Sequence, residues 1–269
     1  GSFVDNQILD ENGNIVPLQK TEDGIFALVE LEPLSLTSFK RGETIAHEVE
    51  VHDGLFLEND LIKYEFDNNG TLISSYDKEL GKEFMEGYGN ILSLYEDRPN
   101  NWDAWDIDFF YRDALLETAV ASSKSKGCNG TLSKQIEFKF RIGNSKIFQK
   151  IVLQPKSKRI DFQTEVNWRE KHKMLRVHFP VNVMSEQATF DIQYGYVKRN
   201  SHRNTSWDKA KFEVVGHKYA DLSDHDYGVA LLNDCKYGYM VHDNLLDLNL
   251  LRSPSNPDPD ADMGKHEFT

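Results

Sequence analysis

Apolar residues recur at every second position along much of the chain, and this alternation predicts β-strands. The period is clearest in three runs, at residues 136–142, 160–168 and 175–183. Each run places apolar side chains on one face of a pleated strand and other side chains on the opposite face. Further strands are expected at residues 61–66, 71–76, 147–153, 190–196, 228–233 and 245–251. The pattern predicts an all-β chain of large sandwich type.

Helical periodicity is scarce, and turn signals divide the chain instead. The best helical candidate, residues 109–121, has apolar residues spread too evenly to define one face. Asp67-Asn68-Asn69-Gly70 is a strong hairpin signal, because Asn and Gly tolerate positive φ angles. A polar stretch at residues 41–54 precedes the long strand series. We therefore divide the chain into residues 1–44, the end of a small β-sandwich or a linker, and residues 45–269, the main β domain.

The net charge and the two cysteines exclude several classes of protein. The sequence has 31 Lys and Arg against 44 Asp and Glu, a formal charge of −13, which disfavours nucleic acid as a partner. No apolar run approaches the length of a transmembrane helix, so no membrane partner is expected. Cys128 and Cys235 form no disulfide framework and no metal motif, which favours a reducing compartment and a cytoplasmic location.

Two near-matches to metal motifs fail on spacing. His47 and His52 are five positions apart, whereas two zinc-binding imidazoles on one helix need a spacing of four. Asp258, Asp260 and Asp262 resemble a calcium loop, but Gly264 falls one position late and prolines stiffen the segment. We therefore expect no metal site and no cofactor in this chain.

The densest chemical signal is the segment Trp102-Asp103-Ala104-Trp105-Asp106-Ile107-Asp108. An indole face stacks on the apolar face of a pyranose, and carboxylates accept hydrogen bonds from sugar hydroxyls. Trp102, Asp103, Trp105 and Asp106 are therefore candidate substrate-binding residues. The alternative is a pair of core tryptophans with carboxylates that cap the backbone.

A second cluster combines a cation, an amide, an indole and a carboxylate without strand periodicity, so a loop is expected there. Loops on a rigid framework often carry function, but a structural polar network explains the same residues equally well. Its candidate substrate-binding residues are His202, Arg203, Asn204, Trp207 and Asp208.

Both clusters belong to a longer stretch of sequence that resembles a known family. The chain resembles the C-terminal β region of glycoside hydrolase family 38 α-mannosidases, in particular the cytosolic and bacterial branch. The blocks that carry the resemblance are Glu96-Asp97-Arg98-Pro99, Trp102-Asp103-Ala104-Trp105-Asp106, His202-Arg203-Asn204-Thr205-Ser206-Trp207-Asp208, Leu232-Asn233-Asp234-Cys235-Lys236-Tyr237-Gly238 and Gly264-Lys265-His266-Glu267-Phe268. Residues 3–40 resemble the end of the small β-sandwich that precedes this region.

The resemblance implies a galactose-mutarotase-like β-supersandwich in an enzyme that hydrolyses terminal α-linked mannose with retention. Such enzymes use an Asp nucleophile, a second carboxylate as acid and base, and a divalent metal, usually zinc. In the family the nucleophile and the metal ligands lie in an α/β catalytic domain and a helical segment, so no residue here inherits those roles. We expect a piece of a longer enzyme, truncated at its C-terminus and inactive alone. Its expected partners are the catalytic domain and a mannose-containing oligosaccharide; homo-oligomerisation stays open.

Two other classes of protein share these features. An independent carbohydrate-binding module would use the same aromatic and carboxylate clusters and would bind mannose by itself. An aldose mutarotase or epimerase shares only the fold, and its chemistry needs an acid and base pair in a concave site.

Overall fold

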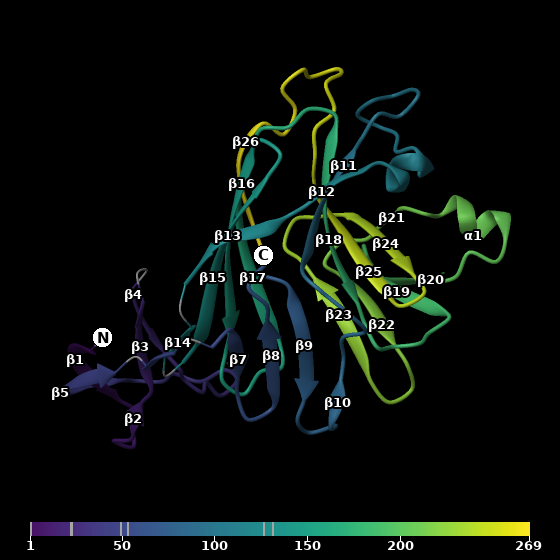
Figure 1. The fold of residues 1–269 in the computed structure, drawn as a ribbon. Helices are drawn as coiled ribbons and strands as arrows, with labels where there is room; N and C mark the ends of the chain where they lie inside the picture. Colours follow the sequence, from purple (N-terminus) through teal and green to yellow (C-terminus); the bar gives the residue numbers. More distant parts are fainter. Residues whose placement is uncertain (1, 22–23, 49, 53, 126, 131) are drawn as a thin grey trace.

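The chain folds into stacked antiparallel β-sheets, as Figure 1 shows in a computed structural model. The structure describes residues 2–21, 24–48, 50–52, 54–125, 127–130 and 132–269. In these ranges two short helical segments accompany the strands, namely η1 (Phe109–Asp113) and α1 (Ser206–Ala210). The prediction of an all-β sandwich is confirmed.

Two large sheets form the body of the molecule. The seven-stranded sheet runs in the order β26-β17-β16-β15-β14-β6, with β13 beside β15. Its strands are β26 (Gly264–Phe268), β17 (Ile160–Trp168), β16 (Ser145–Leu153), β15 (Lys134–Ile142), β14 (Gly127–Asn129), β6 (Glu50–His52) and β13 (Val120–Lys124). The six-stranded sheet runs in the order β12 (Leu115–Thr118), β11 (Ile91–Glu96), β18 (Lys173–Pro180), β25 (Leu245–Arg252), β24 (Gly238–His242) and β21 (Val214–Val215).

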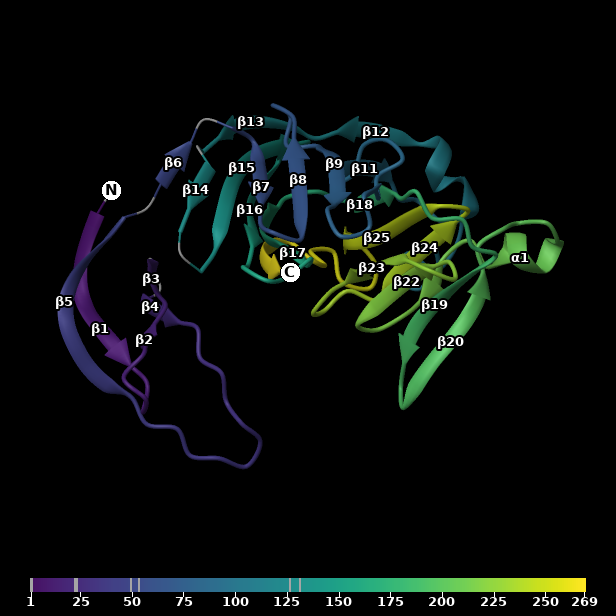
Figure 2. The ribbon, with the colours of Figure 1, turned by 90° about the horizontal axis from the view of Figure 1, so that it is seen from below.

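Two four-stranded sheets extend this body. One contains β10 (Lys82–Glu83), β9 (Leu72–Asp77), β8 (Ile62–Phe66) and β7 (Phe56–Glu58). The other contains β20 (Gly195–Asn200), β19 (Gln187–Ile192), β22 (Tyr219–Ser223) and β23 (Gly228–Leu232). Seen from below, β19 and β20 project from one end of the molecule, away from the N-terminal strands (Figure 2).

The N-terminal residues form a separate small sheet. Its order is β2 (Ile15–Val16), β1 (Ser2–Leu9) and β5 (Lys40–Glu48), and β3 (Leu18–Thr21) pairs with β4 (Gly24–Ala27) beside it. The predicted boundary between residues 44 and 45 falls inside β5, and the chain changes sheets between β5 and β6. The amide of Gln19 links the two parts: its Nε2 donates to Ser133 Oγ at 2.7 Å, and its Oε1 accepts from Leu132 N at 2.6 Å.

Most predicted strands are confirmed, but the predicted strand over residues 190–196 is wrong. β19 ends at Ile192 and β20 begins at Gly195, with Ile192 and Gly195 paired across a tight turn. Tyr194 takes the left-handed conformation in that turn, at φ 61°. The apolar alternation continues through the turn, and Gln-Tyr lacks the Asn-Gly signature that marks most two-residue hairpins. The sequence pattern therefore merged two strands into one.

The predicted hairpin turn between β8 and β9 is confirmed. Asp67 Oδ1 accepts from the backbone N–H groups of Asn69 at 2.8 Å and Thr71 at 2.9 Å, and Gly70 has φ +81°. A Cβ atom on Gly70 would lie 2.6 Å from the ring of Phe140, so both conformation and close packing require glycine there.

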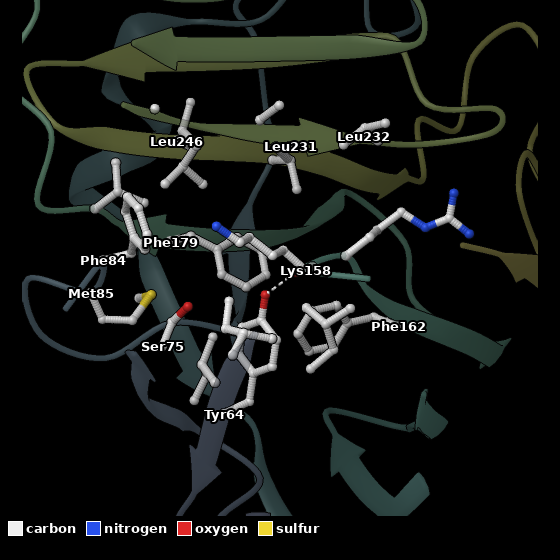
Figure 3. A pocket seen from close by; sticks show the side chains of 18 of the residues that line it. Tyr64, Ser75, Phe84, Met85, Lys158, Phe162, Phe179, Leu231, Leu232 and Leu246 are labelled. Carbon is white, nitrogen blue, oxygen red and sulfur yellow. Dashed lines mark hydrogen bonds between the residues drawn. The ribbon is translucent and has the colours of Figure 1, made fainter. Parts of the chain in front are cut away.

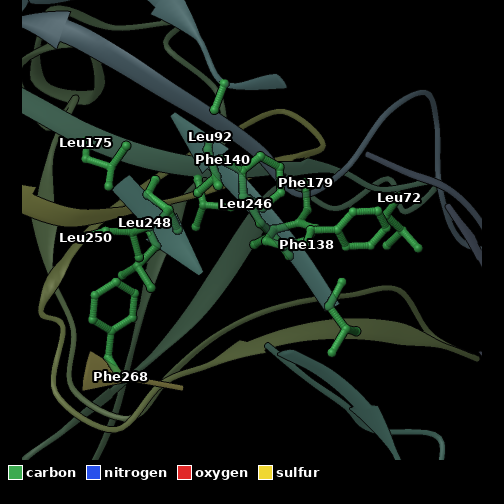
Figure 4. Close-up of a cluster of buried hydrophobic side chains, with 14 of the residues drawn as sticks. Leu72, Leu92, Phe138, Phe140, Leu175, Phe179, Leu246, Leu248, Leu250 and Phe268 are labelled. Carbon is green, nitrogen blue, oxygen red and sulfur yellow. The ribbon is translucent and has the colours of Figure 1, made fainter. Parts of the chain in front are cut away.

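One continuous apolar cluster lies between the two large sheets. Alternate residues of β15 are almost fully buried, and they meet apolar residues of β18 and β25 (Figure 4). The rings of Phe162 on β17 and Phe179 on β18 join the sheets at a centroid distance of 5.6 Å. This core fixes the ends of β11, β18 and β25, from which the loops described below emerge.

The described part of the chain contains no helix that is long and apolar enough to span a membrane.

Candidate functional site

Two segments leave the same end of the six-stranded sheet, and a third lies against η1 beside them. Residues 97–108 follow β11, residues 253–263 follow β25, and residues 201–213 surround α1; in Figure 1 the loop after β25 lies at the top, the loop after β11 at the upper right and α1 at the right. Large exposed aromatic side chains occur on two of these segments and on η1, which follows the first. We call Trp102, Trp105, Phe110 and Trp207 the aromatic rim.

The indoles of the rim point into solvent. The exposed fraction is 71% for Trp102, 69% for Trp105 and 79% for Trp207, whereas Trp168 is fully buried in the core. Three exposed tryptophans are costly to leave in water and commonly mark a binding surface. The alternative of a core tryptophan pair is therefore excluded.

Arg252, at the end of β25, holds the loop that carries Trp102 and Trp105. Its guanidinium forms two hydrogen bonds to the buried carboxylate of Asp97 and donates to the backbone carbonyls of Asp103 and Asp106. Burial raises the pKa of Asp97 above its ordinary value, despite the opposing effect of Arg252. A single planar cation thus satisfies one buried acid and two loop carbonyls.

Asp103 anchors the same loop to the segment after β25. Its Oδ2 accepts from the backbone N–H groups of Ser255 at 2.6 Å and Asn256 at 3.1 Å, and its Oδ1 lies 3.5 Å from His172 Nδ1. Burial would raise the pKa of Asp103, but these N–H groups and His172 outweigh it and lower the pKa. This carboxylate already has its hydrogen-bond partners and serves mainly to position the loop.

Asp106 differs from Asp103 in that its carboxylate is free. The side chain is exposed and its only hydrogen bond among the described residues is from the adjacent N–H of Ile107, at 2.9 Å. Asp108 closes the loop by accepting from Asn100 N at 3.0 Å. Of the two predicted carboxylates, Asp106 therefore has the vacant acceptor positions that a sugar hydroxyl needs.

The backbone of Trp102 forms a turn that carries both indoles beyond the end of β11. Its φ angle is 61°, in the left-handed region that a tryptophan rarely adopts, and its carbonyl accepts from Trp105 N at 2.7 Å and Asp106 N at 2.9 Å. The resulting turn is kept in place by Arg252 and Asp103. The loop is therefore an ordered platform.

The second predicted cluster is organised around Asp208. Its Oδ1 accepts from Asn200 Nδ2 at 2.9 Å, its Oδ2 accepts from Thr205 Oγ1 at 2.6 Å, and His202 Nδ1 lies 3.7 Å away. Thr205 also caps α1 by accepting from Asp208 N at 3.1 Å. His202 and Asp208 thus form the structural network that was one of the two alternatives, while Trp207 and Asn204 remain exposed.

Contacts of η1 bring the two clusters side by side. Phe109 packs edge-on against Phe212 at 5.3 Å between ring centroids, and the Arg203 guanidinium carbon lies 5.9 Å from the Phe109 ring. Next to it, Tyr111 donates to Glu213 Oε1 at 2.5 Å. The sequence placed the clusters about 100 residues apart, and only the fold shows that they share one surface.

A large apolar pocket lies elsewhere, between β8, β17, β18 and β23. Its volume is about 760 Å³, and its walls include Tyr64, Phe162, Phe179 and Leu231 (Figure 3). Several polar groups at its edge are paired with one another: Lys158 Nζ lies 2.7 Å from the carboxylate of Asp77, and Tyr64 donates to the Lys158 carbonyl at 2.6 Å. Sequence reasoning did not identify this pocket, because its walls are ordinary core positions of separate strands.

Among the residues that the structure describes, no three His, Cys, Asp or Glu side chains gather closely enough to bind a metal ion. The side chains of His47 and His52 lie outside the described residues. The acidic segment after β25 forms a turn instead: Asp258 Oδ1 accepts from Asp260 N at 2.9 Å, and Lys171 Nζ lies 3.0 Å from Asp260.

The chain belongs to the family described as glycosyl hydrolases family 38, C-terminal domain, whose profile matches residues 57–260. Human alpha-mannosidase 2C1 is 41% identical over 241 residues, which cover 88% of this chain and 23% of that protein. Alpha-mannosidase G of Dictyostelium discoideum is 41% identical over 223 residues, covering 80% of this chain and 20% of that protein. The chain thus spans less than a quarter of the length of these relatives.

A solved structure supports the fold. An alpha-mannosidase from Enterococcus faecalis V583 superposes with a TM-score of 0.76 over 99% of this chain and 37% of that chain. The sequence identity is 17%, so this likeness concerns the fold alone.

Proposed function

We propose that this chain is the C-terminal part of a retaining, metal-dependent α-mannosidase that hydrolyses terminal α-linked mannose. The relatives that share about 40% of its residues are named alpha-mannosidases. The observation that carries the proposal is the exposure of Trp102 and Trp105 on a loop fixed by Arg252. In the whole enzyme this loop contacts mannose or the neighbouring sugar, and the chain works in a reducing, cytoplasmic compartment.

The residues divide the work of sugar recognition. Trp102 and Trp105 offer flat apolar faces for a pyranose ring, and Asp106 offers free acceptor positions for its hydroxyls. Asp103 and Arg252 bind no sugar and hold these groups in place. This division keeps Trp102, Trp105 and Asp106 as substrate-binding residues and makes Asp103 a positioning residue.

The nucleophile, the acid and base carboxylate and the zinc ion belong to the catalytic domain of the longer polypeptide in this proposal. When bound there, the metal would orient sugar hydroxyls and stabilise charge in the transition state. The chain alone should not hydrolyse an aryl α-mannoside, because the groups that lower the barrier are elsewhere. Turnover that co-purifies with the chain, free of host mannosidases, would contradict this.

The decisive experiment uses the chain joined to a family 38 catalytic domain. Asp106→Asn should lower kcat/KM at least about tenfold, as expected for the loss of a charge-assisted hydrogen bond to a hydroxyl. Asp113→Asn is the matched control, because Asp113 is an exposed carboxylate on η1, outside the loop. Equal kinetics for the two variants would remove Asp106 from the sugar site.

The exposed indoles also permit the chain to act as a carbohydrate-binding module by itself. A titration of the isolated chain with methyl α-D-mannoside separates the two functions. Weak binding that Trp105→Ala abolishes fits a subsite of a larger enzyme, whereas tight binding by the isolated chain would favour an independent module.

A further inference from the structure

Three arginines gather around η1, in a chain whose net charge is −13. Arg176 comes from β18, Arg112 from η1 itself and Arg203 from the loop before α1. The guanidinium carbon of Arg176 lies 5.3 Å from the Tyr111 ring, that of Arg112 lies 5.7 Å from the same ring, and that of Arg203 lies 5.9 Å from the Phe109 ring. The three cations therefore all lie against the two aromatic rings of η1.

Arg176 forms ion pairs with both buried carboxylates of this cluster, those of Glu213 and Asp247. It is fully buried, and its Nε lies 2.6 Å from Asp247 Oδ1 while its Nη1 lies 3.1 Å from Glu213 Oε2. Glu213 also accepts from Tyr111, and the nearby His178 is kept neutral because burial lowers its pKa. Glu213 Oε2 and Asp247 thus pair with Arg176, and neither carboxylate forms an ion pair or hydrogen bond with Arg112 or Arg203.

Within the described ranges, Arg112 and Arg203 therefore lack a directly bound counter-ion, although the charges of Glu213 and Asp243 reach Arg203. Neither forms an ion pair or a hydrogen bond with any residue that the structure describes, and the buried atoms Arg112 Nε and Arg203 Nη2 have no acceptor. Burial, followed by the positive charge of Arg112, lowers the pKa of Arg203, and the smaller opposing effects of Tyr111, Glu213 and Asp243 do not offset this. The next carboxylate, that of Asp243, lies 3.8 Å from His242 and pairs with neither arginine. Two partly buried cations without a directly bound counter-ion are costly, and binding of an anion to them would offset that cost.

We propose that Arg112 and Arg203 form a binding site for a small oxyanion, a phosphate or carboxylate group, beside the aromatic rim. Each planar guanidinium can donate two parallel hydrogen bonds to such a group. Phe109 and Tyr111 exclude water from one side of both cations, which strengthens the attraction. The inference goes beyond sugar recognition and does not depend on it, although a sugar on Trp207 or Phe110 could present the anion.

To test this, the chain is titrated with inorganic phosphate, mannose 6-phosphate and mannose in separate experiments. NMR and calorimetry measure the binding of each ligand. Arg112→Gln with Arg203→Gln should weaken binding of both phosphates at least about tenfold, because two charge-assisted contacts are lost. Binding of unphosphorylated mannose should stay unchanged, because the sugar site proposed above consists of Trp102, Trp105 and Asp106 and no longer includes Arg203. Equal affinities for the two phosphates indicate a free anion as the ligand, and tighter binding of mannose 6-phosphate indicates a sugar-borne anion.

Two further variants make the result interpretable. Arg98→Gln removes an exposed arginine that already pairs with Glu96 at 2.7 Å, and should leave phosphate binding intact. Arg112→Lys with Arg203→Lys keeps both charges but loses the planar fork, and should bind phosphate with intermediate affinity. The proposal is overturned if the folded wild-type chain binds no phosphate, or if the Gln double variant binds it as wild type does. If the wild-type chain binds phosphate but not mannose, the result counts against the proposed sugar subsite and leaves the anion site standing.

Discussion

The aromatic rim and the apolar pocket are both large and aromatic, yet they suit different ligands. At the rim, Trp102, Trp105 and Asp106 are exposed, and polar residues behind them hold the loop. In the pocket, Phe179 and Phe162 form walls whose neighbouring polar groups are already paired, such as Lys158 with Asp77. A sugar presents hydroxyls around an apolar ring, so it needs open stacking faces and free acceptors together. The rim supplies both on one loop, and pocket size alone is therefore a poor guide to the sugar site in this fold.

The largest loss of stability is expected from breaking the buried ion pair between Arg252 and Asp97, which holds the loop of the rim. Arg252→Met should lower the free energy of unfolding by about 3–5 kcal/mol, because Asp97 is left charged and buried without a partner. Without the arginine, the pKa of Asp97 should rise further, because burial then acts without the opposing effect of Arg252. The difference in free energy of unfolding between wild type and variant should therefore shrink as the pH falls and Asp97 becomes protonated. Urea unfolding at pH 7 and pH 4 measures both values. An equal deficit at the two pH values would show that Asp97 is not the cause.

A substitution in the pocket should lower stability without changing mannoside binding. Phe179→Ala should cost about 3 kcal/mol of stability, because it enlarges a cavity and removes the contact with Phe162. Binding of methyl α-D-mannoside, measured at a temperature where the variant stays folded, should not change. Loss of mannoside binding in this folded variant would move the sugar site to the pocket.

A smaller effect separates the two aspartates of the rim. Asp103→Asn should cost about 1–2 kcal/mol, since its carboxylate accepts two backbone N–H groups, whereas Asp106→Asn should cost almost nothing. Because the pKa of Asp103 is lowered below 3.8, its contribution is complete above that pH and is lost as the pH falls further. The comparison is thermal unfolding of wild type and Asp103→Asn from pH 7 to pH 3. The wild type should lose more stability on acidification than the variant.

The smallest effect on stability is expected at the indoles themselves. Trp105→Ala should change the free energy of unfolding by less than about 0.5 kcal/mol, because the side chain is mostly exposed. Its mannoside binding should nevertheless fall strongly, since the stacking face is gone. Trp168→Phe is the contrasting variant, with a buried indole: it should lose stability and keep binding. A destabilised Trp105→Ala would place that indole in a structural contact.

The strands could be predicted because their signal is local, whereas the arrangement of the site could not. Alternation along β15 or β18 follows from which residues face the core. The same alternation failed between β19 and β20, where Tyr194 continues the pattern through a turn. The composition of the loop identified Trp102, Trp105 and the aspartates as candidates. It could not distinguish Asp103 from Asp106, because the partners of Asp103 are Ser255 and Asn256, which lie about 150 residues along the chain.

The same separation has a consequence for biosynthesis. Arg252 is 155 residues beyond Asp97, and 149 beyond the Asp103 carbonyl to which it also donates. A ribosome that has made only the strands through β24 has produced both indoles without the cation that orders them. The rim should therefore acquire its shape late, after β25 has paired with β18, since contacts at large sequence separation close slowly. Until that moment the nascent chain exposes a disordered, tryptophan-rich loop, a segment of the kind that molecular chaperones bind.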